Sequence, residues 1–434
     1  MRTLWTSVRS RTVGRKLFRD VGVQTAANVV DAGLSVLQGM VVARRLGPAG
    51  YGVSALVMMY PGVLFTFLDP RASDASIKYL GEFASRGERE RASAMCTLGY
   101  AVDLATALAA LLLVAASAGW AAEHVVHAPE LRLPMLLFTA AFVPRAFGGT
   151  SIAVLTTLGR FRTLATVTVL QATLRTAVVV ALVCGGAGVT GVVYGNALAL
   201  VLHGVALTIL AFPAITATWG RAPVARAWTL LAGHRRAIFS FLLYNDVNAF
   251  LGSFVKQVDV LFLGWLRGPT DAGFYRLAKS MGTVLGLVVS PLQGTTYPRL
   301  ARLSGLGREA ELRAAVRRYA LQVGAPLGVA VLVALPLLPW VITGLVGTSY
   351  LPAATTAQLV LLGGAMWLAC FWVRPYLMAV GRIRTFTRLY LLSLVPYGAS
   401  FLVLARAFGP AGMAVGYVGH NLLLFLLPAF WVLR

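Results

Sequence analysis

The chain has 434 residues, of which 58% are apolar and 12% charged, and its 38 Lys and Arg residues outnumber its 15 Asp and Glu residues. A typical soluble domain has about a quarter of its residues charged, so this composition excludes an ordinary soluble protein and indicates an integral membrane protein. The net charge of +23 would favour nucleic acid as a partner of a soluble protein, but here most cations lie in loops between apolar runs. We therefore expect membrane lipids with anionic headgroups as partners, and no nucleic acid.

Apolar runs of about 20 residues, the length that crosses a bilayer as a helix, follow one another along nearly the whole chain. A basic cytoplasmic leader is predicted at 1–20. Six spans follow, near 21–44, 51–75, 94–118, 133–157, 163–185 and 189–212. An amphipathic linker at 213–236 is expected to lie on the cytoplasmic surface. Six more spans are predicted near 237–266, 272–296, 318–345, 355–380, 386–408 and 411–433.

The distribution of cations supports this count of twelve. With the N-terminus inside, 25 Lys and Arg residues fall in cytoplasmic segments and five in external loops. Because cytoplasmic loops are enriched in Lys and Arg, this bias favours twelve spans with both termini in the cytoplasm.

The two sets of spans carry the same motifs in the same order, at a nearly constant separation along the chain. The first span has a polar stripe on one helical face, formed by Gln24, Asn28, Asp31, Ser35 and Gln38, and it ends at a Gly-Pro pair. The stripe returns in the seventh span at Asn245, Gly252, Lys256 and Asp259, again followed by Gly-Pro. Six spans is an even number, so both halves insert in the same orientation. The sequence thus predicts an all-α membrane protein of two parallel six-helix repeats, 21–212 and 237–434, around a central cavity.

Two motifs of the first half resemble a known family. Arg45-Leu46-Gly47-Pro48-Ala49-Gly50-Tyr51-Gly52 follows the polar first span, and Lys78-Tyr79-Leu80-Gly81-Glu82 closes the second. Together with the repeat, they resemble the Wzx-type O-antigen flippases of the multidrug/oligosaccharidyl-lipid/polysaccharide exporter superfamily. The resemblance implies two six-helix lobes in the inner membrane of a bacterium. It also implies transfer of an undecaprenyl-diphosphate-linked oligosaccharide, an anionic polyprenyl-linked glycan, to the outer leaflet.

Four cations lie deep in predicted spans: Arg145, Arg175, Lys256 and Arg374. Charges at membrane depth are costly and usually face the interior of a helix bundle. Forked guanidinium donors and a lysine ammonium suit a diphosphate headgroup, so these residues are the predicted substrate-binding set. The alternative is pairing within the protein, for instance of Lys256 with Asp259. Arg276 and Lys279 are weaker candidates.

Further polar residues are candidates for ion coupling or for lining a cavity: Asn28, Asp31, Gln38, Asp103, Asn245, Asp246 and Asp259. A proton or sodium gradient is the energy source these carboxylates suggest, and no organic cofactor is expected. The only Lys followed by Ser or Thr, Lys279-Ser280, lies in an apolar segment, which argues against an ATP-binding loop. His124 and His127 have no third ligand at metal spacing, so no metal site is predicted.

Four functions compete on this sequence. The favoured one is a flippase that works by alternating access. An ion-coupled exporter of drugs or small solutes is second, and it would favour an acidic cavity. An enzyme is third, because the longest external loop, about 119–132, is too short for a catalytic domain. A scaffold among other polysaccharide-assembly membrane proteins is fourth.

Overall fold

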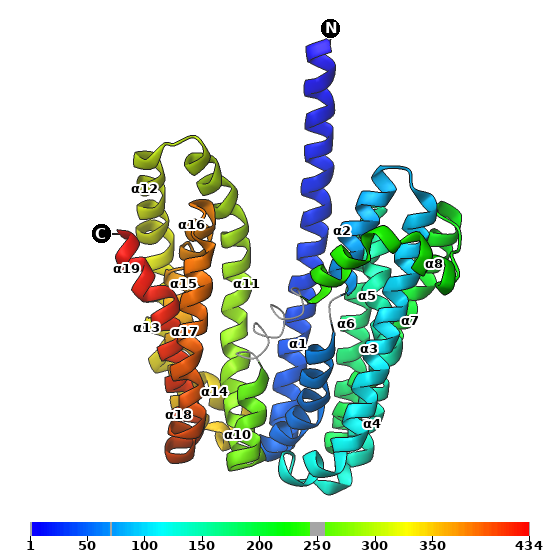
Figure 1. Cartoon of the computed structure of the whole chain (residues 1–434). Coiled ribbons are helices and arrows are strands. Elements are labelled where there is room, and N and C mark those ends of the chain that lie inside the picture. Colours follow the sequence, from blue (N-terminus) through cyan, green and yellow to red (C-terminus); the bar gives the residue numbers. More distant parts are fainter. Residues whose placement is uncertain (1, 70–71, 244–256, 434) are drawn as a thin grey trace. The chain divides into compact units, whose positions relative to one another are not determined.

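The computed structural model describes residues 2–69, 72–243 and 257–433 (Figure 1). These residues form helices joined by short connections, with no strand among them. The lipid core of a membrane offers no hydrogen-bond partners, so every backbone N–H and C=O group in it must be bonded within the protein. A helix meets this requirement on its own. Large apolar side chains point outward from several helices; Leu112 is 71% exposed and Trp340 is 74% exposed.

Eight helical segments of the described residues are long and apolar enough to cross a membrane. They are Gly22–Leu68, Arg89–His124, Pro129–Thr157, Phe161–Cys184, Gly188–Thr218, Glu309–Val346, Ala353–Ala379 and Leu404–Leu433. The span expected near 272–296 lies in α11 (Pro269–Gly305), and most of the span expected near 386–408 lies in α17 (Ile383–Leu402). Neither helix is among the eight. The span expected near 237–266 lies partly outside the described residues. The prediction of twelve spans is therefore not confirmed.

Contacts divide the chain into two compact units. Unit 1 consists of Met1–Val42, Val57–His124 and Ala128–Val258. Its helices are most of α1 (Arg2–Leu68), then α2 (Ala72–Ser85), α3 (Arg89–His124), η1 (Pro129–Leu131), α4 (Arg132–Ala140), α5 (Phe142–Thr157), α6 (Phe161–Cys184), α7 (Gly188–Thr218), α8 (Val224–Leu230) and η2 (Ala232–His234). Helix α7 packs against α5 and α6, and α3 packs against α2, α5 and α8. Tyr79, Phe83, Met95 and Leu207 are buried in its core.

Unit 2 consists of Ala43–Leu56, Val125–His127 and Asp259–Arg434. Besides α11 and α17 it contains α10 (Asp259–Arg267), α12 (Glu309–Arg318), η4 (Tyr319–Gly324), α13 (Ala325–Ala334), η5 (Leu335–Leu337), α14 (Leu338–Val346), η6 (Thr348–Tyr350), α15 (Ala353–Ala369), α16 (Val373–Ala379), α18 (Leu404–Asn421), η7 (Leu422–Leu426) and α19 (Leu427–Leu433). Helix α15 packs against α11, α13 and α18, and α17 packs against α18. Phe371, Trp372 and Leu424 are buried in its core.

Glycines with positive φ end or break helices at matching places in the two halves of the sequence. They occur in pairs with a nearly constant separation along the chain: Gly47 and Gly268, Gly87 and Gly307, Gly159 and Gly381. Glycine adopts this conformation without the steric cost that a Cβ atom imposes. At Gly47 the long α1 contains a non-helical residue with φ 66° and ψ 179°, so the expected break at the Gly-Pro pair is present.

Within unit 2, the segment after the first Gly-Pro pair crosses the start of α11 at very short range. A Cβ atom on Gly52 would collide with the carbonyl oxygen of Pro269, and one on Gly273 would collide with the carbonyl oxygen of Pro48. The two clashes are reciprocal, so the duplicated glycines allow the two backbones to touch. Only hydrogen fits at both positions.

Tyr350, between α14 and α15, contacts the segment Ala43–Leu56 within unit 2. Its fully buried hydroxyl donates to the carbonyl oxygen of Ala43 at 3.1 Å. Its ring lies 6.5 Å from the ring of Tyr51, edge to face. Burial raises the pKa of the Tyr350 phenol above its usual range, so the hydroxyl keeps the proton that it donates.

Candidate functional site

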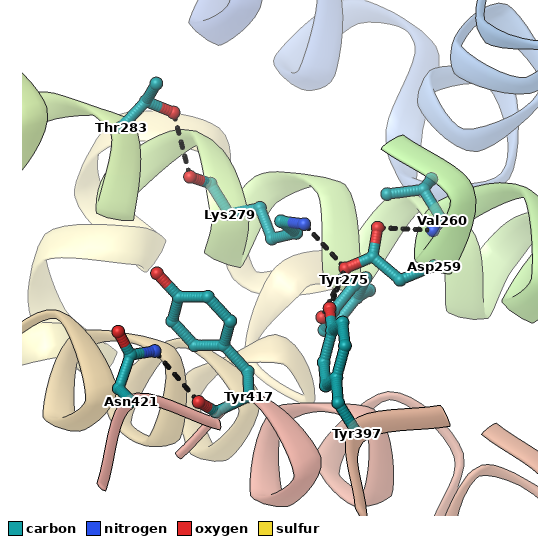
Figure 2. Close-up of polar contacts among 8 residues, drawn as sticks. All are labelled: Asp259, Val260, Tyr275, Lys279, Thr283, Tyr397, Tyr417 and Asn421. Atoms are coloured by element: carbon teal, nitrogen blue, oxygen red, sulfur yellow. Dashed lines mark hydrogen bonds and ion pairs between the residues drawn. The ribbon is translucent and has the colours of Figure 1, made fainter. Parts of the chain in front are cut away.

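Asp259, the first residue of α10, is the centre of a polar network within unit 2 (Figure 2). Its side chain is completely buried. The Oδ2 atom accepts hydrogen bonds from Tyr275 Oη at 2.8 Å and Tyr397 Oη at 2.6 Å, and it forms an ion pair with Lys279 Nζ at 2.5 Å. The Oδ1 atom accepts from the backbone N–H of Val260 at 2.8 Å. We call Asp259, Tyr275, Lys279 and Tyr397 the Asp259 network.

Helix periodicity places these partners. Tyr275 and Lys279 are four residues apart on α11 and therefore share one face. Tyr397 comes from α17, and the ring of Tyr417 on α18 lies 6.0 Å from the lysine nitrogen. Because a buried charge is costly without a partner, the ammonium and the hydroxyls make the ionised carboxylate tolerable at this position.

Unit 1 contains an open polar cavity of about 310 Å³. Its polar lining comes from Asp69, Ser73, Asp103, Thr106 and Arg145, and its apolar lining includes Phe65 and Phe142, whose rings stack at 4.8 Å. A volume of this size has room for several water molecules or for part of a larger polar ligand. We call it the Arg145 cavity.

Two carboxylates accompany the single guanidinium in this cavity. Asp69 and Asp103 both act electrostatically on Arg145. Asp103 is fixed by Thr150, whose backbone N–H and hydroxyl donate to Oδ2 at 3.1 and 2.7 Å. With all three groups ionised the lining carries a formal charge of −1. The sequence predicted Arg145 as one of four substrate-binding cations, and the structure places two acids beside it.

The polar stripe of α1 meets α6 within unit 1. Arg175 Nη2 donates to Asp31 Oδ1 at 3.0 Å and to Ser35 Oγ at 2.5 Å. Arg175 therefore forms an ion pair within unit 1. The pairing is incomplete, since Arg175 Nε and the Oε1 atoms of Gln24 and Gln38 are buried without a hydrogen-bond partner among the described residues.

A second arginine with an unmatched donor lies in unit 2. The guanidinium of Arg276 on α11 sits 4.7 Å above the ring of Tyr51. Its Nη1 atom is buried and has no hydrogen-bond partner in the part of the chain that the structure describes. Buried polar atoms are nearly always bonded, so an unmatched donor is a reason to look for a ligand.

Residues 17–304 match the family model described as polysaccharide biosynthesis protein. The chain belongs to this family. The resemblance to polysaccharide exporters that the two sequence motifs indicated is thereby confirmed. No curated protein matches the sequence.

Solved structures agree with the family at the level of the fold. The lipid II flippase MurJ in an inward closed conformation aligns with a TM-score of 0.72 at 12% identity, over 95% of this chain and 87% of the flippase. An inward-facing multidrug resistance MATE transporter of the MOP superfamily aligns at 0.73 and 13%, over 92% and 93%. A MOP superfamily transporter from Pyrococcus furiosus, whose structure is described as having a binding pocket of reverse polarity, aligns at 0.63 and 14%, over 96% and 94%. The chain is a multi-pass membrane protein with a MOP-superfamily transporter fold, and these fold relatives are transporters or flippases rather than enzymes.

The predicted site residues of this family member fall into different settings. Arg145 and Asp103 share the Arg145 cavity, and Asp31 is bonded to Arg175. Arg374 on α16 is exposed, with its guanidinium 5.9 Å from the ring of Phe386. Asn28 is exposed and accepts a hydrogen bond of 3.4 Å from Gln24. Lys256, Asn245 and Asp246 lie outside the described residues.

Three members of the Asp259 network were not predicted to act together. Lys279 was a weak candidate, and Lys256 was the partner considered for Asp259. Tyr275 and Tyr397 gave no signal beyond their position in apolar helices. The spacing of Tyr275 and Lys279 on one helical face could have suggested a shared partner, but the position of α17 could not be read from the sequence.

Proposed function

We propose that this protein is a flippase that moves an undecaprenyl-diphosphate-linked oligosaccharide from the inner to the outer leaflet of a bacterial cytoplasmic membrane. Its membership of the polysaccharide biosynthesis protein family carries the proposal. The fold, which a lipid II flippase shares, is compatible with a lipid-linked substrate. Other polysaccharide-assembly membrane proteins are the partners expected for such an activity.

The proposed layout has twelve spans in two parallel six-helix repeats, with both termini in the cytoplasm and alternating access as the mode of transport. Two observations support the duplication. Glycines with positive φ recur at equivalent places in the two halves of the sequence. The packing of α7 on α5 and α6 in unit 1 also has a counterpart in the packing of α18 on α15 and α17 in unit 2. An even number of spans in each repeat would keep the two repeats parallel.

Three arginines support an anionic headgroup. Arg145 borders an open cavity, while Arg175 and Arg276 each have a buried nitrogen without a hydrogen-bond partner among the described residues. Guanidinium groups bind phosphate oxygens through forked, charge-assisted hydrogen bonds. Lys256 and Arg374 complete the proposed substrate-binding set.

The acids beside Arg145 make binding reversible in this proposal. A diphosphate that reaches Arg145 competes with Asp69 and Asp103 for the same guanidinium. A transporter must release its substrate. An arginine that is paired with carboxylates in the empty state binds the anion less tightly than an unpaired one, and so allows release. The inside-negative membrane potential favours outward movement of an anion by about 2.3 kcal/mol per charge per 100 mV.

An ion-coupled exporter of drugs or small solutes is the second candidate. The two carboxyl groups beside the single guanidinium in the Arg145 cavity favour it, because an acidic cavity suits cationic solutes. The fold similarity to a MATE transporter fits it equally well. In that case a proton or sodium gradient acting on carboxylates such as Asp103 would supply the energy.

Transport by the purified full chain in proteoliposomes tests both candidates. The probe is a fluorescent undecaprenyl-diphosphate-linked oligosaccharide, and its appearance in the opposite leaflet is followed by quenching with a membrane-impermeant reductant. We expect transfer above that of empty liposomes, and faster transfer under a potential that favours movement of the anion. Absence of transfer with and without the potential, together with export of a cationic dye, would replace the flippase by the exporter.

Substitution at Arg145 links the activity to the cavity. Arg145→Gln is expected to lower the initial rate of transfer at least about tenfold, since a charge-assisted bond to phosphate is worth roughly 1.5–3 kcal/mol. Arg160→Gln, at an exposed arginine before α6, is the matched control and should transfer at the wild-type rate. Equal rates in the two variants would remove Arg145 from the proposal.

A further inference from the structure

One oxygen atom of Asp259 is saturated by donors from two other helices. Its Oδ2 atom receives the hydroxyls of Tyr275 and Tyr397 and the ammonium of Lys279 (Figure 2). A carboxylate oxygen has about two lone-pair sites, so three donors leave no acceptor capacity on this atom. The carboxylate is also fully buried, and Lys279 is only 17% exposed.

The lysine nitrogen lies beside groups that also attract small cations. Nζ lies 2.5 Å from the carboxylate oxygen on which two phenol oxygens converge. The ring centroids of Tyr275 and Tyr417 lie 5.7 and 6.0 Å from it, and the faces of aromatic rings also attract cations. Oxygen ligands around one negative charge are what a hard monovalent ion would require.

A divalent ion does not fit the same place. It generally takes several carboxylates, and no group of three or more His, Cys, Asp or Glu side chains is gathered anywhere in the described residues. Asp259 provides one negative charge, and one positive charge neutralises it. The charge that neutralises it here belongs to α11 of this chain itself.

We propose that the Lys279 ammonium is a tethered cation that fills a monovalent-cation site at Asp259, so that unit 2 binds no sodium ion there. The ligands of the latent site are the Asp259 carboxylate and the hydroxyl oxygens of Tyr275 and Tyr397. This inference concerns ion binding alone and does not depend on which substrate the protein transports. A gradient of sodium would then act on the protein without occupying Asp259.

Removal of the lysine side chain would open the site. Lys279→Ala deletes the ammonium and its methylene chain, and leaves a buried carboxylate facing the two hydroxyls. Such an ionised carboxylate is destabilising unless a cation enters or a proton neutralises it, because desolvated charges need a partner. Sodium and methylammonium are both small enough to replace a lysine ammonium, and choline, which lacks N–H donors, is the inert salt.

The experiment measures sodium dependence of the purified full chain in detergent at constant ionic strength, with choline chloride as replacement. Wild type should show the same midpoint of thermal unfolding in both salts and no Asp259-dependent binding of radioactive sodium. Lys279→Ala should gain a sodium-dependent rise of the midpoint, about 2–4 °C or more, and bind one sodium ion per chain. The double variant Asp259→Asn/Lys279→Ala should lose both gains, and Lys78→Ala, at an exposed lysine, should behave as wild type.

Two results would overturn the proposal. One is sodium stabilisation of the wild type that Asp259→Asn abolishes. The other is a folded Lys279→Ala protein whose stability responds to neither sodium nor methylammonium. If Lys279→Ala does not fold in any salt, Lys279→Gln, which keeps a hydrogen-bond donor without the charge, replaces it, and a sodium response of that variant is again the required result.

Discussion

The contact of α1 with α6 in unit 1 and that of α10 with α17 in unit 2 are related by the sequence repeat. Arg175 on α6 and Tyr397 on α17 occupy equivalent positions in the two halves of the sequence. Each donates to an aspartate of its own unit, Arg175 to Asp31 at 3.0 Å and Tyr397 to Asp259 at 2.6 Å. The side chains of Arg175 and Asp31 are 19% and 36% exposed, whereas Asp259 is completely buried. Equivalent pairs of helices are therefore joined by a partly exposed ion pair in unit 1 and by a buried hydrogen-bond network in unit 2.

The difference shows which of these two helix contacts has polar atoms without hydrogen-bond partners. Gln38, which the repeat aligns with Asp259, has a buried Oε1 atom without a hydrogen-bond partner among the described residues. Asp259 accepts bonds on both of its oxygens. Unmatched polar atoms are costly unless a ligand or water reaches them, while a saturated network mainly holds its helices together. We infer that the unit 1 stripe faces ligand or water and that the Asp259 network is structural.

The largest effect on the free energy of unfolding is expected when a buried aspartate of each unit is replaced by asparagine. Asp259→Asn removes the counter-charge of Lys279 and is expected to lower the free energy of unfolding by about 3–5 kcal/mol. Asp103→Asn keeps an oxygen acceptor for the two donors of Thr150, so we expect a loss of about 1 kcal/mol. Chemical denaturation of both purified variants gives the comparison, and an Asp103→Asn protein as unstable as Asp259→Asn would contradict it.

A medium effect is expected at the glycine crossing of unit 2. Gly273→Ala places a Cβ atom against the carbonyl oxygen of Pro48, which backbone movement must relieve, and we expect a loss of about 1–3 kcal/mol. Gly33→Ala on α1 meets no atom within 4 Å and should be neutral or stabilising by up to about 1 kcal/mol. Thermal unfolding of the two variants in detergent measures the difference. Equal midpoints would show that the crossing can relax.

The smallest effect is expected at the ion pair of unit 1. Asp31→Asn leaves an amide oxygen beside Arg175, and the partly exposed pair is worth at most about 1 kcal/mol. Stability should therefore change little, in contrast to Asp259→Asn. A loss of stability comparable to that of Asp259→Asn, measured by the same denaturation, would show that the unit 1 ion pair contributes as much to stability as the Asp259 network.

Local features of the chain could be predicted from the sequence. Residue spacing placed Gln24, Asn28, Asp31, Ser35 and Gln38 on one helical face, because the period of the helix is fixed by its own hydrogen bonds. The Gly-Pro pair at Gly47 predicted a break, since its backbone conformation depends on residue type. The resemblance of the motifs to polysaccharide exporters led to the correct family.

The partners of each charged side chain were decided only by the tertiary structure. Arg145, judged from its own helix, indicated a cationic site, but α3 and the residue that follows α1 bring Asp103 and Asp69 to the same cavity. Asp259 was considered with Lys256 three residues earlier, yet α11 delivers Lys279 to it from 20 residues further on. Charge balance at a buried group depends on every helix packed around it, and a periodic pattern within one helix contains no information about its neighbours.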